Sequence, residues 1–230
     1  MKNIAVILAA GKGTRLGEPL PKQYLKVAGK TVLEHSIEAF ERHPAIQEIC
    51  VVVAPDRTEM VESICRINGY EKVSKIIAGG SERYESSVAA IRAYASAGDC
   101  NLIFHDAARP CVSERVITNV VDALAEFCAA TAAVATTDTI LEASDDGVVA
   151  SIPPRSRLRN VQTPQGFRLA TIRRAYEAGL TDPGFVTTDD CGVVARYCPD
   201  VPIRIVDGDR NNIKLTYSED LRTIQRLLTR

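Results

Sequence analysis

A glycine-rich segment close to the N-terminus is the first candidate for chemistry. It runs from Leu8 to Gly17 as Leu-Ala-Ala-Gly-Lys-Gly-Thr-Arg-Leu-Gly and follows the apolar stretch from Ile4 to Leu8. Glycines directly after a buried strand allow backbone N–H groups to face the phosphate oxygens of a ligand. The segment is not a Walker loop, because the Lys-Ser/Thr pair is missing, and its glycine spacing is one residue too long for the dinucleotide fingerprint. The pattern indicates a phosphate-binding loop of another kind.

Two cations accompany this segment. Arg15 lies inside it, and Lys22 follows within Pro21-Lys22-Gln23. Both side chains can bring positive charge to the place where phosphates would lie, Arg15 as a planar fork and Lys22 as a point charge. For either residue taken alone, a solvated surface cation is the alternative interpretation.

A second glycine-containing segment, from Gly79 to Arg83, lies between a predicted strand and a predicted helix. In an open α/β sheet such a junction lies at the carboxyl edge of the strands, where ligands bind. The backbone of Gly80 and Ser81, together with Ser86 in the following helix, could contact the base or ribose of a nucleotide. A glycine turn that only opens the helix is an equally good interpretation of this segment alone.

An acid and a base follow the predicted strand from Leu102 to Phe104, in the sequence His105-Asp106-Ala107-Ala108-Arg109-Pro110. Asp106 is a hard oxygen ligand well placed to hold Mg²⁺ against phosphate, whereas the structural alternative is a cap on the following helix. We assign His105 to packing, because phosphoryl chemistry does not require it. The candidate motifs contain no Ser-His or Cys-His pair for nucleophilic catalysis.

The scaffold that must bring these segments together can be predicted from the apolar pattern. Short apolar runs alternate with helical spacing, which is typical of a doubly wound, mostly parallel α/β sheet with helices on both faces. The predicted strands are Ile4 to Leu8, Glu48 to Val53, Leu102 to Phe104 and Ile203 to Val206, and the predicted helices are 31 to 42, 84 to 95, 117 to 124 and one starting near Thr216. Thr31 and Glu34 form a capping box for the first helix, and Glu219 is expected to serve the last.

The stretch from 137 to 162 departs from this alternation. Its short apolar pieces are broken by Asp145-Asp146-Gly147 and by Pro153-Pro154, which predicts a hairpin that projects from the sheet. Projecting hairpins often serve oligomer contacts. We expect a single domain over residues 1–230, with this arm used for dimerisation.

Composition and charge narrow the function classes. The 230 residues are 46% hydrophobic and 25% charged, as in ordinary soluble enzymes. The formal net charge is -1, so no global field draws the chain to nucleic acid or to an anionic membrane. Apolar runs are too short to span a bilayer, the start lacks a signal-peptide layout, and the 7 cysteines are scattered without a CxxC pair. We expect a cytoplasmic protein with reduced thiols and with neither a nucleic-acid nor a membrane partner.

Several short motifs between residues 4 and 221 occur in the order of one known family. They are Ala-Ala-Gly-x-Gly-x-Arg at 9–15, Pro21-Lys22-Gln23-Tyr24, Gly79-Gly80-x-x-Arg83-x-x-Ser86, His105-Asp106-Ala107-Ala108-Arg109-Pro110, Asp138-Thr139, Gln162-Thr163-Pro164-Gln165, Thr188-Asp189 and Asn212-Ile213-Lys214. Each is short, but so many ordered matches make accident implausible. Together they resemble the motifs of the 2-C-methyl-D-erythritol 4-phosphate cytidylyltransferase family.

The resemblance implies a Rossmann-like fold of the nucleotide-diphospho-sugar transferase type, a homodimer whose arms cross, CTP and a polyol phosphate as substrates, and Mg²⁺ on the phosphates. Arg15 and Lys22 would then stabilise the transition state, and Asp106 would bind the metal. The implied nucleotide contacts are Ala9, Ala10, Gly11, Gly13, Gly80, Ser81, Ser86, Asp106 and Ala107. The implied contacts of the polyol phosphate are Arg109, Thr139, Thr163, Thr188 and the catalytic pair Arg155 and Lys214, with Arg155 supplied by the arm of the partner subunit.

The acceptor is less sharply indicated than the reaction. The resemblance implies CMP transfer from CTP to 2-C-methyl-D-erythritol 4-phosphate, a step of isoprenoid precursor synthesis. Leu141 stands where these enzymes commonly have lysine, and the segments 152–155 and 188–191 look closer to ribitol-5-phosphate cytidylyltransferases, so ribitol 5-phosphate is the alternative acceptor. The features that favour the methylerythritol branch are Ala9-Ala10-Gly11, Tyr24 and Ala107-Ala108.

Two other function classes share the expected fold. A nicotinamide oxidoreductase is also doubly wound and glycine-looped, but the loop spacing is wrong for it. A nucleotide sensor without turnover could keep the fold. The residues that argue against such a loss of activity are Arg15, Lys22, Asp106 and Lys214.

Overall fold

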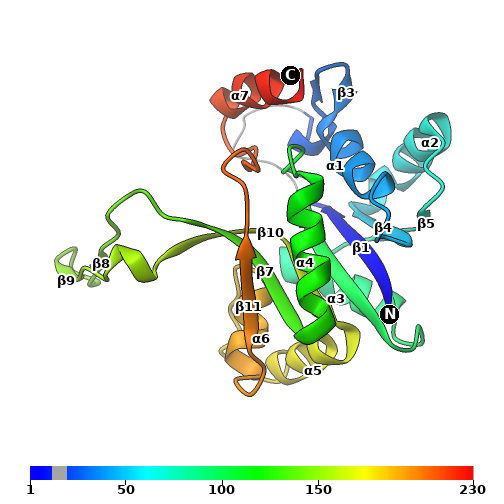
Figure 1. The fold of residues 1–230 in the computed structure, drawn as a ribbon. Helices are drawn as coiled ribbons and strands as arrows, with labels where there is room; N and C mark the ends of the chain where they lie inside the picture. The colour runs from blue at the N-terminus through cyan, green and yellow to red at the C-terminus, as the bar shows by residue number, and fades with distance from the viewer. Residues whose placement is uncertain (12–19, 230) are drawn as a thin grey trace.

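A seven-stranded sheet forms the centre of the chain, in the order β11-β7-β10-β6-β1-β4-β5 (Figure 1). It is seen in a computed structural model that describes residues 1–11 and 20–229. The strands are β1 (Lys2–Ala9), β4 (Glu48–Val53), β5 (Val73–Ala78), β6 (Cys100–Asp106), β7 (Ala129–Ala135), β10 (Arg159–Arg168) and β11 (Ile203–Asp207). All neighbouring pairs are parallel except those of β10, which runs antiparallel to both β6 and β7. The expected mostly parallel α/β sheet is confirmed.

Helices cover both faces of this sheet. They are α1 (Val32–Glu41), α2 (Thr58–Asn68), α3 (Arg83–Ala93), α4 (Glu114–Glu126), α5 (Leu169–Gly179), α6 (Asp190–Tyr197) and α7 (Ser218–Leu228). Side chains alternate along β1, so Ile4, Val6 and Leu8 pack with α3, α5 and α6, whereas Ala5 and Ile7 pack with α1, α2 and α4. This is the doubly wound arrangement that the alternating pattern predicts. In the described part of the chain, no helix combines the length and apolar character needed to cross a membrane.

A third, smaller core lies where a short β-hairpin meets the C-terminal helix α7 (Figure 1). The hairpin of β2 (Lys26–Val27) and β3 (Lys30–Thr31) leads into α1, and α7 packs beside it through Ile224. Leu215 is buried in the same cluster, and its N–H donates to the carbonyl of Ala108 at 2.8 Å. The segment before α7 is therefore fixed against the loop that follows β6.

The helix caps agree with the sequence at one end of the chain and differ slightly at the other. The Thr31 hydroxyl accepts from the Glu34 N–H at 3.1 Å, and the Glu34 carboxylate accepts from the Thr31 N–H at 2.7 Å. At α7 the carboxylate of Asp220, not that of Glu219, accepts from the backbone N–H groups of Thr216 and Tyr217. The helix begins at Ser218, later than expected, so Asp220 occupies the third helical position that a capping carboxylate needs.

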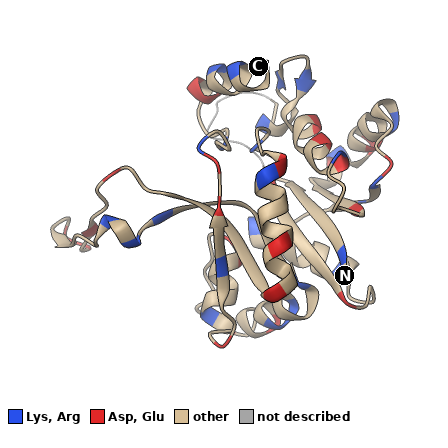
Figure 2. Cartoon of the chain, in the orientation of Figure 1, with Lys and Arg blue, Asp and Glu red and all other residues tan. Residues whose placement is uncertain are grey.

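The arm projects from the body between β7 and β10 (Figure 1). Near its tip β8 (Glu142–Ala143) pairs with β9 (Val149–Ser151) as an antiparallel hairpin, followed by the 3-10 helix η4 (Arg155–Arg157). The arm is slightly shorter than the expected 137–162, because the chain re-enters the sheet as β10 at Arg159. Figure 2 shows basic residues in the part of the arm between its tip and the sheet, whereas both signs are interspersed over the body.

Candidate functional site

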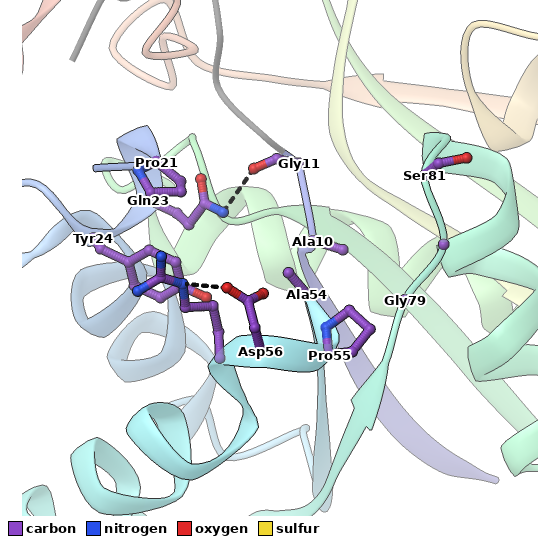
Figure 3. A pocket seen from close by; sticks show the side chains of 12 residues that line it. Ala10, Gly11, Pro21, Gln23, Tyr24, Ala54, Pro55, Asp56, Gly79 and Ser81 are labelled. Carbon is purple, nitrogen blue, oxygen red and sulfur yellow. Dashed lines mark hydrogen bonds and ion pairs between the residues drawn. The ribbon is translucent and has the colours of Figure 1, made fainter. Parts of the chain in front are cut away.

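A cavity of about 410 Å³, a size usual for small-molecule sites, lies at the carboxyl ends of β1, β4 and β5 (Figure 3). Its walls come from the loop after β1, from the 3-10 helices η2 (Lys22–Tyr24) and η3 (Pro55–Arg57), and from the loop after β5. The predicted site residues that line it are Ala10, Gly11, Gly80 and Ser81. Gly13 and Arg15, expected in the same loop, lie outside the described residues.

A glycine permits the loops after β1 and β5 to meet. A Cβ atom at Gly79 would lie 2.6 Å from both the Ala10 Cβ and the Ser86 Oγ, so no other residue fits without displacement. The Ser86 hydroxyl is buried and accepts from the Gly80 N–H at 3.3 Å. In this structure Ser86 therefore supports the backbone of the cavity wall.

The loop after β1 is held from the side of η2. The Gln23 side-chain amide donates to the carbonyl of Ala9 at 2.6 Å and to that of Gly11 at 2.9 Å, the second bond being visible in Figure 3. The neighbouring Lys22 extends the other way, and its ammonium donates to the Leu215 carbonyl at 2.7 Å. Lys22 thus reaches the segment that contains Lys214.

Asp106 ends β6 and is the centre of a charge cluster. Its Oδ2 lies 2.7 Å from the Lys214 ammonium, and its Oδ1 lies 3.2 Å from Arg83 Nε. Burial alone would raise the pKa of Asp106, but the charges of Arg83 and Lys214 outweigh it and hold the pKa well below its usual range. The alternative role as a helix cap does not apply, because α4 has Ser113 as its N-cap.

Arg83 and Asp190 belong to this cluster and were not assigned a role from the sequence. Arg83 Nη1 lies 2.8 Å from Asp190 Oδ2, while its Nε contacts Asp106. Asp190 has 0% exposure, and its other oxygen accepts from the Tyr176 hydroxyl at 2.7 Å. The only sequence signal for them was their position in the short motifs around Gly79 and Thr188.

The segment that carries Lys214 is held by buried polar side chains. Arg109 Nη1 donates to the Asn212 carbonyl at 2.7 Å, and the Asn212 amide donates to the Thr163 carbonyl at 2.8 Å. The Gln162 side-chain amide adds a bond to the Asp209 carbonyl at 2.8 Å. In this structure Arg109 therefore positions backbone near the site.

His105 is fully buried, which fits its assignment to packing. Burial lowers its pKa to about 4, so the ring is neutral near pH 7. Its Nδ1 lies 3.1 Å from the Thr163 hydroxyl, which also accepts from the Asp106 N–H at 3.1 Å. The Thr163 hydroxyl, predicted to contact the acceptor, thus links two residues of the strand end. The neighbouring Ala107 is buried and donates its N–H to the Leu8 carbonyl at 3.0 Å.

Three predicted acceptor contacts are not joined to the Asp106 cluster within one chain. Thr139 and Arg155 are exposed residues of the arm, and Arg155 Nη1 donates to the Thr137 carbonyl at 3.1 Å. Thr188 is exposed on the loop just before Asp189, whose carboxylate caps α6.

The charge cluster offers a metal ion one carboxylate at the strand end, that of Asp106. The described residues include no group of three or more His, Cys, Asp and Glu side chains that could hold one. Mg²⁺ in phosphate-transfer sites commonly takes only one or two carboxylates and completes its coordination with substrate phosphates and water. The single carboxylate of Asp106, at the edge where phosphates would lie, fits such a site.

This chain is similar to known proteins in both sequence and fold. The family model described as 2-C-methyl-D-erythritol 4-phosphate cytidylyltransferase matches residues 3–230. A protein of that name from Thermobifida fusca (strain YX) is 47% identical over 229 residues, covering 97% of this chain and 92% of the relative. The crystal structure of 4-diphosphocytidyl-2C-methyl-D-erythritolsynthase from Anaerococcus prevotii DSM 20548 superposes with a TM-score of 0.88 at 29% identity, covering 100% of this chain and 96% of the other.

A more distant relative bears on the choice of acceptor. The bifunctional ribulose 5-phosphate reductase/CDP-ribitol pyrophosphorylase Bcs1 of Haemophilus influenzae is 38% identical over 222 residues. The match covers 96% of this chain but only 47% of that protein.

Proposed function

Because this chain belongs to the 2-C-methyl-D-erythritol 4-phosphate cytidylyltransferase family, we propose that it transfers CMP from CTP to 2-C-methyl-D-erythritol 4-phosphate and releases pyrophosphate. The product would be 4-diphosphocytidyl-2-C-methyl-D-erythritol, an intermediate of isoprenoid precursor synthesis. The observation that carries the proposal is the position of Asp106, Lys214 and Lys22 at the same sheet edge as the 410 Å³ cavity. Cations beside a nucleotide-sized cavity suit phosphoryl transfer, which depends mainly on positioning and on charge stabilisation.

The acceptor needs no general base. A phosphate monoester has a second pKa of about 6 and is mostly a dianion at neutral pH, so its oxygen is already a nucleophile. It would attack the α-phosphorus of CTP directly, with pyrophosphate leaving on the opposite side. The burial and low pKa of His105, about 4, agree with a reaction that uses no imidazole base.

Charge that accumulates on the α-phosphate oxygens in the transition state would be met by Lys22 and Arg15. Lys22 is suited to this because its ammonium is already directed to the strand-end side of the site, where it donates to the Leu215 carbonyl. A cation fixed before the reaction stabilises the transition state without reorganisation at the moment of bond formation.

We assign the single protein ligand of Mg²⁺ to Asp106. Asp106 would hold the ion, whose charge supplies neutralisation of the phosphates when it is bound. The Lys214 ammonium, which now contacts Asp106 Oδ2, would then be released to contact phosphate oxygens instead. Asp106 and Lys214 would therefore both change partners when the nucleotide binds.

We propose that the acceptor site is completed in a homodimer. The arm carries exposed apolar side chains, which are typical of an interaction surface rather than of a solvated hairpin. They are Ile140, Leu141, Val148, Val149 and Ile152. Arg155 and Thr139 on this arm would meet Thr188, Arg109 and Lys214 of the partner's body, within a dimer in which each chain forms one domain.

The 7 free thiols suit the reducing cytoplasm, where we place this enzyme.

Ribitol 5-phosphate remains the second acceptor to be tested, because the Haemophilus influenzae relative includes a CDP-ribitol pyrophosphorylase in its name. Its identity of 38% is below the 47% of the Thermobifida fusca relative, which favours methylerythritol phosphate.

The proposal is tested by incubating the chain with CTP, Mg²⁺ and 2-C-methyl-D-erythritol 4-phosphate and identifying the products by ³¹P NMR. Two coupled diphosphate resonances of the CDP-polyol are expected together with pyrophosphate. CTP binding without either product would instead indicate a nucleotide sensor.

A further inference from the structure

A series of ion pairs and hydrogen bonds connects Asp106 to the two helices α5 and α6. Arg83 bridges Asp106 and Asp190, at 3.2 Å and 2.8 Å, and the Tyr176 hydroxyl donates to Asp190 at 2.7 Å. These residues come from β6, α3, α6 and α5, so the connection is made entirely by the tertiary fold. On the other side of Asp106 this series of contacts ends at Lys214, whose side chain is 40% exposed.

The burial of Asp190 requires a partner of opposite charge. A carboxylate with 0% exposure is strongly unfavourable unless it is paired and hydrogen-bonded. Arg83 supplies the positive charge through an ion pair to Oδ2, and the Tyr176 hydroxyl supplies a hydrogen bond to Oδ1. Burial would lower the pKa of Arg83, but the carboxylates of Asp190 and Asp106 outweigh it and raise the pKa, so the guanidinium stays charged. Two carboxylates and one guanidinium thus form a fixed unit.

The shape of the guanidinium decides what this unit does. Arg83 contacts Asp106 through Nε and Asp190 through Nη1, so one planar group sets the distance between the two carboxylates. Asp106 Oδ1 is occupied by this partly buried contact, whereas Oδ2 faces the more exposed Lys214 ammonium. The two oxygens of Asp106 therefore have different roles, one anchored and one exchangeable.

We propose that Asp190 is a positioning residue of the reaction, which holds Arg83 so that Arg83 fixes Asp106 Oδ1 and leaves Oδ2 for the metal–nucleotide complex. This inference rests on the proposed function, since it concerns the ligand that Asp106 offers to Mg²⁺. Without Asp190 the Arg83 guanidinium is free to rotate. It would then no longer hold Asp106 in one orientation and could bind the phosphates instead. If the Arg83–Asp190 ion pair served only to join α3 to α6, its loss would lower stability but leave metal affinity unchanged.

The test measures metal binding directly, with Mn²⁺ as the probe. Electron paramagnetic resonance reports free Mn²⁺ during titration of the enzyme in the presence of the non-reacting α,β-methylene analogue of CTP. Asp190→Asn keeps the size of the side chain but removes its charge, and it should weaken Mn²⁺ binding about 10- to 100-fold, the usual effect of losing a partner that orients a metal ligand. Asp106→Asn/Asp190→Asn should bind Mn²⁺ no more weakly than Asp106→Asn alone, because nothing is left to position.

A second variant and a matched control separate positioning from folding. Arg83→Lys leaves Asp190 a cation but cannot bridge both carboxylates, so it should weaken Mn²⁺ binding in the same way, even if Asp190→Asn fails to fold. Asp200→Asn disrupts another Arg–Asp pair, the exposed contact of Arg174 with Asp200 at 2.9 Å, and should keep wild-type Mn²⁺ affinity. Melting temperatures establish that each variant is folded.

The possible outcomes distinguish this inference from the proposed function. Wild-type Mn²⁺ affinity in folded Asp190→Asn and Arg83→Lys, or losses that multiply with Asp106→Asn, would overturn the positioning role while leaving CMP transfer intact. Conversely, wild-type enzyme that binds Mn²⁺ with the CTP analogue but forms no CDP-polyol would contradict the proposed reaction and not the role of Asp190.

Discussion

The Lys214 ammonium lies 2.7 Å from Asp106 Oδ2, although 108 positions separate the two residues along the chain. The contact joins the end of the central strand β6 to the segment before α7, which returns to the sheet edge after β11. A lysine cation thereby occupies the carboxylate oxygen that we assign to Mg²⁺. If Asp106 holds Mg²⁺ as we propose, nucleotide binding should move the Lys214 ammonium from Asp106 Oδ2 to the phosphates.

The exchange predicts a specific defect for Asp106→Asn. Loss of one anionic oxygen ligand should raise the Mg²⁺ concentration needed for half-maximal rate, and an excess of chelator should abolish activity of the wild-type enzyme. Rates measured over a Mg²⁺ series at saturating CTP will show the shift. Wild-type activity that persists in excess chelator would remove the metal from the mechanism.

Lys22→Ala and Arg15→Ala should each lower kcat by roughly a hundredfold or more, the scale seen when one preorganised transition-state donor is removed. Steady-state kinetics at saturating substrates measure this. Lys26→Ala is the matched control for charge, because Lys26 is an exposed lysine of the neighbouring β2, and it should leave kcat unchanged. Near-normal kcat in both Lys22→Ala and Arg15→Ala would exclude them from catalysis.

Subunit mixing tests the assignment of Arg155 to the partner's site. Arg155→Ala and Lys22→Ala enzymes should each be nearly inactive, but a mixed dimer contains one site with both residues intact. Activity should therefore return on mixing, whereas Arg157→Ala, on the same 3-10 helix of the arm, should be active by itself. If confirmed mixed dimers stay inactive, Arg155 does not act across the dimer.

Acid stability should depend on Glu48, at the start of β4. Burial alone would raise its pKa, but hydrogen bonds from Lys2, Ser74 and Tyr94 outweigh burial and lower the pKa from 4.5 to about 2. A carboxylate with a lowered folded-state pKa contributes stability that is complete above 4.5 and is lost as the pH falls from 4.5 towards 2.

The measurement is chemical denaturation of the wild type and Glu48→Gln across this pH range. The free energy of unfolding of the variant should be lower than that of the wild type at neutral pH, and the difference should shrink as the pH falls below 4.5. Glu59→Gln, at an exposed position of α2, serves as the control and should follow the wild type. A difference that is independent of pH would mean that ionisation of Glu48 does not stabilise the fold.

Elements with a clear apolar period could be predicted from the sequence, whereas β7 could not. The runs in β1, β4 and β6 are short and apolar, as buried parallel strands are. β7 reads Ala-Ala-Thr-Ala-Ala-Val-Ala, and alanine favours helices over strands. It is a strand because β10 and β11 pair with it on both sides, a tertiary effect that local propensity does not contain.

The candidate site, like the fold, could be predicted from the sequence only in part. Strand-end motifs were enough to bring the glycine loops and Asp106 to one sheet edge, because the carboxyl ends of parallel strands meet there. The Arg83–Asp190 contact could not be inferred, since Asp189 and Asp190 are adjacent in sequence and only the turn into α6 decides which one is buried. The Thr163 hydroxyl, expected to face the acceptor, contacts His105 because β10 places it beside the end of β6.

The most direct test of the proposed activity is the ratio of kcat/KM for two acceptors measured side by side with CTP and Mg²⁺. Discrimination should come from the acceptor contacts that we propose for Thr139, Thr163 and Thr188, since a charged clamp recognises the phosphate of either polyol. A missing hydrogen-bond partner separates substrates strongly, so the two values should differ clearly. We predict a much higher kcat/KM for 2-C-methyl-D-erythritol 4-phosphate; a higher value for ribitol 5-phosphate would contradict the assigned acceptor.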